Sequence, residues 1–103
     1  MTQKYEDRRK EFEWLFQGQT ANGNGTNTIK VHDHRTTLKC WGAFDGATVE
    51  IQVLAEDGTS WIPAFTFTNE GVQFGEVGSQ EEEFRASISS VGAGTDINVT
   101  MTY

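Results

Sequence analysis

The sequence is poor in the residues that form disulfides, metal sites and membrane spans. It has one cysteine, one proline and two histidines in 103 residues. A single cysteine excludes an internal disulfide framework. No apolar run approaches the roughly 20 residues that a membrane-spanning helix needs, and the N-terminal stretch has no apolar core typical of a signal peptide. We therefore expect one domain, in a cytosol-like compartment and without a membrane partner.

Positive charge is also scarce. Eight lysines and arginines stand against fifteen aspartates and glutamates, which gives a net charge of −7. Such a chain repels phosphate backbones, so binding to nucleic acid is disfavoured. Residues 1–13 hold four basic and four acidic side chains, so the rest of the chain carries the whole −7. This predicts a charged N-terminal arm at residues 1–11 and an acidic domain at residues 12–103.

Alternation of apolar and polar residues is abundant. In the last run, Ile97, Val99, Met101 and Tyr103 alternate with polar residues, as expected for a half-buried strand. The same period recurs along the chain, with glycine-rich and asparagine-rich turns every 8 to 12 residues or so. About eight short strands of this kind predict an all-β fold, a small antiparallel β-sandwich that is jelly-roll-like or a barrel.

Local patterns refine this prediction. Phe12, Trp14 and Phe16 alternate with other residues and predict a first strand with these three side chains on one face. Residues 28–34 and 36–44 predict two further strands.

Two signals concern the middle of the chain. The Asp57-Gly58 pair favours a hairpin turn. Pro63 cannot donate a backbone hydrogen bond, so we expect its strand at a sheet edge or at a bulge.

The segment His32-Asp33-His34 is the one cluster with metal-ligand character. On a strand, both histidines would project to the same face and could share an ion. A zinc site needs a third and usually a fourth ligand, so two surface histidines at a strand end are the favoured interpretation. Cys40 lies in an alternating pattern, which predicts a buried thiol rather than a nucleophile. We predict no catalytic, metal-binding or cofactor-binding residue, and no enzyme.

Three tryptophans, Trp14, Trp41 and Trp61, raise the hypothesis of a carbohydrate-binding module. Their positions within alternating patterns favour another interpretation, in which one or two fill the core and another anchors a protein contact.

The stretch from Trp41 to Tyr103 resembles a group of small virion-associated proteins of tailed phages. The shared patterns are a G-x-F-x-G-A-T-V-x-[IL]-Q strand, a DGTxW hairpin and a closing [FL]-R-A-x-[IV]-S…GT-x-[IV]-x-V strand pair. They correspond here to Gly42 to Gln52, Asp57 to Trp61 and Phe84 to Val99. The resemblance covers about the last sixty residues, and it implies a β-sandwich carried on the particle without catalysis.

From this resemblance we expect a virion structural protein, without a particular place on the virion. Because an acidic protein is better placed outside a head filled with polyanionic DNA, we expect a head decoration or cement protein that stabilises a tailed-phage head. Its partner would be the major capsid protein or another virion protein, and a homo-oligomer, with a trimer favoured, is expected. The virion would assemble in the host cytoplasm. A tail, neck or fibre component and a carbohydrate-binding module remain alternatives.

Residues 1–17 are expected to carry part of the capsid or inter-subunit contact. Arginine, tyrosine and tryptophan dominate interface hot spots, and the predicted partner-binding residues are Tyr5, Arg8, Arg9, Phe12 and Trp14. The alternative is a loose chain end without function.

Overall fold

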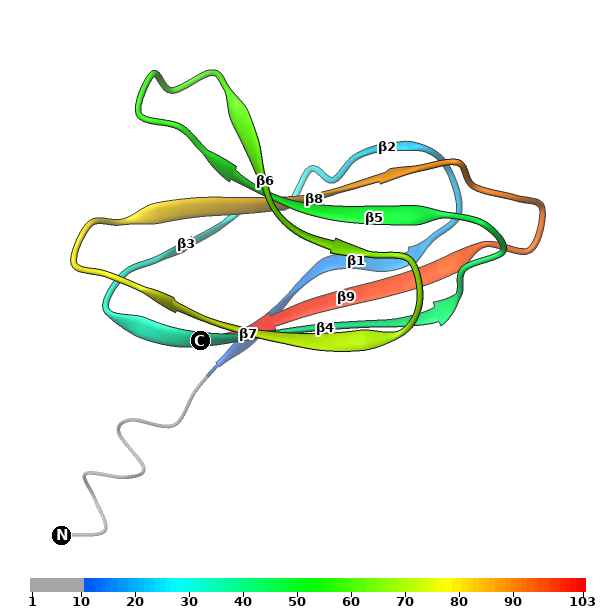
Figure 1. Cartoon of the computed structure of the whole chain (residues 1–103), viewed down its shortest axis with the longest axis horizontal. Coiled ribbons are helices and arrows are strands. Elements are labelled where there is room, and N and C mark those ends of the chain that lie inside the picture. The colour runs from blue at the N-terminus through cyan, green and yellow to red at the C-terminus, as the bar shows by residue number, and fades with distance from the viewer. Residues whose placement is uncertain (1–10) are drawn as a thin grey trace, which may run out of the picture.

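A computed structural model describes residues 11–103, which form two antiparallel β-sheets packed face to face (Figure 1). These residues contain no helix, and the predicted all-β sandwich is confirmed. The strands are β1 (Phe12–Gln19), β2 (Gly23–Asn24), β3 (Ile29–Val31), β4 (His34–Ala43), β5 (Thr48–Leu54), β6 (Trp61–Phe67), β7 (Gly71–Val77), β8 (Glu82–Ser89) and β9 (Asp96–Thr102).

The strand order joins distant parts of the chain. Sheet A has the order β1-β9-β4-β7, and sheet B has the order β2-β8-β5-β6, with β3 also paired to β8. The last strand therefore lies between β1 and β4. Phe12 pairs with Thr102, Thr102 with Thr37, and Thr37 with Phe74, so these four residues form one row across sheet A.

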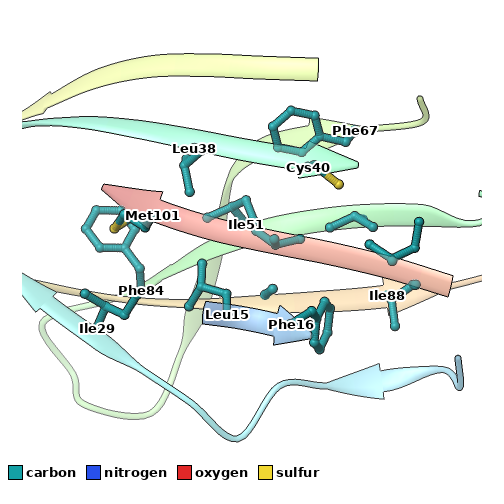
Figure 2. Packing of buried hydrophobic residues seen from close by; sticks show 14 of the residues in the cluster. Leu15, Phe16, Ile29, Leu38, Cys40, Ile51, Phe67, Phe84, Ile88 and Met101 are labelled. Carbon is teal, nitrogen blue, oxygen red and sulfur yellow. The ribbon is translucent and has the colours of Figure 1, made fainter. Parts of the chain in front are cut away.

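Apolar side chains from both sheets meet between the layers (Figure 2). Five inward residues of β5 and β9 are fully buried, as their alternation predicts: Val49, Ile51, Ile97, Val99 and Met101 are each 0% exposed. No tryptophan belongs to this core. The interpretation that one or two tryptophans fill the core is therefore wrong, because aliphatic side chains and phenylalanines occupy the space between the sheets.

The first strand contains a bulge. The pairing of β1 with β9 shifts between Trp14 and Phe16, and as a result both Leu15 and Phe16 are buried. The Asn27 side chain donates a hydrogen bond of 3.0 Å to the backbone oxygen of Trp14 at this point. The prediction that Phe12, Trp14 and Phe16 share one face is wrong at Phe16, which the bulge directs into the core.

The strand predicted over residues 28–34 ends at Val31. Asp33 has a φ of 54° and turns the chain, and its N–H donates to the Gly78 oxygen at 2.7 Å. β3 belongs to sheet B, whereas β4, which begins at His34, belongs to sheet A. The bend at Asp33 therefore carries the chain from one layer to the other.

The β5–β6 hairpin turns at residues 55–60, where Asp57-Gly58 lies as predicted. Carboxylate oxygens of Asp57 accept hydrogen bonds from the N–H groups of Thr59 and Ser60, both at 2.8 Å, and from the Ser60 hydroxyl at 2.6 Å. These bonds, first of all that from the Ser60 side chain, lower the pKa of Asp57 to about 2.

Pro63 lies in β6, the edge strand of sheet B. The pairing of β5 with β6 shifts by one residue between Ile51 and Gln52, where Gln52 faces Pro63. The expectation of an edge or a bulge is confirmed, and the structure shows both.

Candidate interaction surface

The outer face of sheet A exposes most of the large apolar side chains that solvent reaches. Phe12 is 58% exposed, Trp41 38%, Val72 47% and Phe74 74%. Together with Trp14 they define what we term the aromatic face. Lys39 of β4 pairs with Val72 and is exposed on the same face. Large exposed apolar side chains gathered on one face are typical of a protein contact site.

Register explains how residues so far apart in sequence share one surface. Side chains alternate between the two faces of a sheet, and Leu38 and Cys40 of β4 are buried in the core. Trp41 therefore points outward. Phe12 and Phe74 end the row across the four strands, so they are separated by three strand spacings, about 14 Å.

The aromatic rings on the β1 side of the face contact one another. Phe12 and Trp14 meet edge to face with ring centroids 6.2 Å apart, and the Trp14 and Trp41 centroids are 5.7 Å apart at a tilt of 48°. Thr100 of β9 pairs with Trp14 and is only 5% exposed, although it lies on the outer face. The two tryptophans flank this strand and shield it, so the rings are held in place before any partner binds, which lowers the entropic cost of association.

Charged side chains lie beside the aromatic face. Arg35 and Glu76 are 3.2 Å apart at the end of the face nearest the start of β4, with their side chains 82% and 75% exposed. A pair this exposed contributes little to stability. A polar margin is usual at protein interfaces, and Lys39 places one further charge within the face itself.

The outer face of sheet B is different. The Arg85 Nε donates to Gln52 at 2.7 Å, and Gln52 in turn donates to Glu50 at 2.7 Å. The Arg85 guanidinium also lies 4.3 Å from the centroid of the Trp61 ring. Hydrogen-bonded polar groups thus occupy this side, and the two faces of the sandwich are chemically distinct.

The structure brings two of the predicted partner-binding residues together. Phe12 and Trp14 are neighbours on the aromatic face, and their role in binding stays a prediction. Tyr5, Arg8 and Arg9 lie outside the described residues.

Two members of the aromatic face, Val72 and Phe74, were not singled out by any sequence pattern. Trp41 alternates with Leu38 and Cys40, a pattern that marks it as outward-facing. Its meeting with Trp14 depends on the strand order, which no local pattern reveals.

The two histidines lie on either side of the bend at Asp33. His32 follows β3 and His34 begins β4, in the other sheet. The geometry of the metal-site alternative, with both histidines on the same face of one strand, is therefore wrong. The favoured interpretation of two surface histidines at a strand end is confirmed, since both are exposed beside strand ends. Within residues 11–103, no group of three or more His, Cys, Asp or Glu side chains is placed to hold a metal ion.

Cys40 is a buried thiol, as predicted. It is 1% exposed, and burial, together with the charge of Glu70, raises its pKa to about 12. The thiol therefore stays protonated at neutral pH, and a protonated, buried sulfur is a poor nucleophile.

Comparison of the chain with protein-family models, with curated proteins and with solved structures finds no match in any of the three. The described part of the chain has no helix that is long and apolar enough to cross a membrane.

Proposed function

We propose that this protein is a non-enzymatic structural component of a virus particle, and that its aromatic face binds another protein of that particle. The exposed aromatic face carries the proposal. Tryptophan is among the residue types that dominate the binding energy at protein interfaces, and here Trp14 and Trp41 lie together on one side of a sheet.

A head decoration or cement protein is the form of this function that we favour. Support comes from the resemblance of residues 41–103 to virion-associated proteins of tailed phages. Charge also supports it, because a chain with a net charge of −7 is better accommodated outside a head filled with polyanionic DNA than inside it. In this proposal the partner is the major capsid protein, and the protein acts as a homo-oligomer, with a trimer favoured. A tail, neck or fibre location is the alternative within the particle.

The test is to separate a lysate of cells that express the gene naturally on a density gradient and to probe the fractions for this protein. We expect it in the fractions of assembled particles. The double variant Trp41→Ala with Phe74→Ala should remain at the top of the gradient while keeping a β-type circular dichroism spectrum. The matched control is Trp61→Ala, which removes a tryptophan from the opposite sheet and should still sediment with particles. Absence of the unaltered chain from particles would overturn the proposal.

A carbohydrate-binding module is the second candidate, favoured by the neighbouring Trp14 and Trp41 rings. Stacking of a sugar on either ring would change tryptophan fluorescence. Titration with a panel of oligosaccharides separates the candidates. A saturable change that Trp41→Ala abolishes supports sugar binding, and no change with any sugar supports a protein contact.

A further inference from the structure

A second surface lies at the end of the sandwich where the β5–β6 hairpin spreads away from β7 (Figure 1). A groove of about 400 Å³ opens there between the two sheets. Its apolar lining comes from Val53, Ile62, Phe65, Val77 and Phe84. Ile62 is 48% exposed, so this lining is open to solvent. The volume falls within the roughly 300–1,000 Å³ typical of ligand pockets.

The groove lies between two strands with open edges. β6 ends sheet B and β7 ends sheet A. The outer edge of such a strand presents backbone N–H and C=O groups, which an extended segment can pair with. Gly75 and Gly78 line the groove next to β7, and no atom lies within 4 Å of the position that a Cβ would take at Gly78. An extended chain therefore has room to approach this edge.

Charge selects the kind of segment that fits. The charged side chains lining the groove are Glu56, Glu76 and Glu82, of which Glu76 already contacts Arg35. A recess of about 340 Å³ shares Glu56 and Glu82 with the groove and adds Glu81 and Glu83. Among the described residues lining the two hollows, Lys30 is the one basic side chain. The complementary occupant is a basic segment that also carries an apolar or aromatic anchor.

The chain itself contains such a segment. Residues 1–10 have four basic and two acidic side chains, a net charge of +2, so the −7 of the whole chain leaves −9 for residues 11–103. Tyr5 stands among these charges and supplies a ring for the apolar part of the groove.

We propose that residues 1–10 of one copy bind in the groove between β6 and β7 of a neighbouring copy. Glu11 and Tyr103 exchange backbone hydrogen bonds of 2.9 and 2.8 Å, which fixes the start of β1 at one edge of sheet A. The groove opens at the opposite edge, beside β7. A contact between different surfaces of two identical chains is heterologous, and it closes into a ring when the rotation allows. The proposal rests on the homo-oligomer proposed above, but its tests need no virus particle.

Disulfide trapping tests the contact directly. Gln3→Cys and Gly78→Cys are made in separate full-length chains, which keeps every basic side chain of the segment. Mixed under oxidising conditions, the two variants should form a disulfide-linked dimer. Cys40 should not compete, because it is buried. The control pairs Gln3→Cys with Ala93→Cys, in the turn before β9, and should give at least about tenfold less dimer at equal concentration, since effective concentration sets the yield.

A chain carrying both Gln3→Cys and Gly78→Cys distinguishes the source of the segment. Intermolecular disulfides, with a yield that rises with protein concentration, support the proposal. Rapid closure within one chain, independent of concentration, would overturn it in favour of a segment that folds back on its own body.

Charge reversal tests the chemistry. Arg8→Glu with Arg9→Glu, or Glu56→Lys with Glu82→Lys, should each weaken self-association by about tenfold or more at low salt, because like charges then meet across the contact. Combining the four changes should restore association. The control Asp96→Lys reverses a carboxylate at the opposite end of sheet A and should leave the sedimentation mass unchanged. A monomeric unaltered chain, or a groove variant that associates normally, would overturn the arm contact and leave particle binding by the aromatic face untouched.

Discussion

Val99 is a position where the fold requires an apolar side chain. It is fully buried on β9, facing Phe16 on one neighbouring strand and Cys40 on the other. Val99→Asp should unfold the domain, because an unpaired buried carboxylate costs several kcal/mol against a total stability of about 5–15 kcal/mol. Thermal melting followed by circular dichroism measures this.

The matched control for that experiment is Asn98→Asp. Asn98 is on the other face of the strand, and its side-chain oxygen accepts a hydrogen bond of 3.0 Å from the Gly18 N–H. An aspartate retains this acceptor, so the variant should melt close to the unaltered protein. Equal losses from the two changes would contradict the register of β9.

Asp57 makes the stability of the hairpin turn depend on pH. Its pKa is lowered from 3.8 to about 2, so its hydrogen bonds stabilise the turn above pH 4 or so and lose strength as pH falls towards 2. Asp57→Ala should lower the melting temperature at pH 6, and the deficit should shrink between pH 4 and pH 2. Glu56→Ala, whose side chain takes no part in these hydrogen bonds, is the control. A deficit that is constant with pH would contradict this role.

Gly42 is a position where the backbone permits no side chain. Its φ is 126°, and a Cβ there would overlap the backbone oxygen of Asp96. We expect Gly42→Ala to destabilise the protein by roughly 1–3 kcal/mol or more through backbone strain alone. Gly78→Ala meets no neighbouring atom and should change stability little. Urea unfolding of both variants provides the comparison.

At the scale of strands, alternation predicted the buried faces well in strands that lie between two others in a sheet. The inward residues of β5, β8 and β9 are those that a period of two selects. The bulge that buries both Leu15 and Phe16 was not predictable, because it depends on how β1 matches β9, about eighty residues further along. The bend at Asp33 was not predicted for a similar reason. It exists because β3, before the bend, pairs in sheet B, whereas β4, after it, pairs in sheet A.

The aromatic face likewise has one part that local spacing predicts and one part that depends on strand order. Phe12 and Trp14 were predicted to lie together because two-residue spacing suffices to place them on one face. The alternation of side chains along β4 is enough to predict that Trp41 points outward. Its contact with Trp14 exists only because β9 lies between β1 and β4, and strand order is a property of the whole fold.

This contact should be measurable as coupling between two strands that share no backbone hydrogen bonds. Trp14→Ala, Trp41→Ala and the double variant form a thermodynamic cycle. We expect a coupling of about 0.5–1.5 kcal/mol, as for other aromatic pairs. The pair Trp14→Ala and Trp61→Ala, on different sheets, should be additive. Additivity of the first pair in urea unfolding would show that the rings stabilise the sheet independently.

For the whole molecule, residues 1–10 are expected to matter for assembly rather than for folding. Among residues 11–103, the buried core side chains run from Leu15 to Met101. Deleting residues 1–10, while keeping Glu11 and its hydrogen bonds to Tyr103, should shift the melting temperature by only a few degrees and should abolish self-association. Calorimetry and sedimentation measure the two effects separately. A large loss of melting temperature would show that these residues belong to the folded unit.

The position of β9 also orders events in time. β1 leaves the ribosome first and β9 last among the strands, yet β9 separates β1 from β4. Until residues 96–102 emerge, β1 has no partner in sheet A. Its apolar side chains therefore stay exposed for several seconds of synthesis, at about 5–20 residues per second. A nascent chain that stalls before Asp96 is thus a natural substrate for chaperones and proteases, whereas one that is released can close sheet A by inserting a single strand.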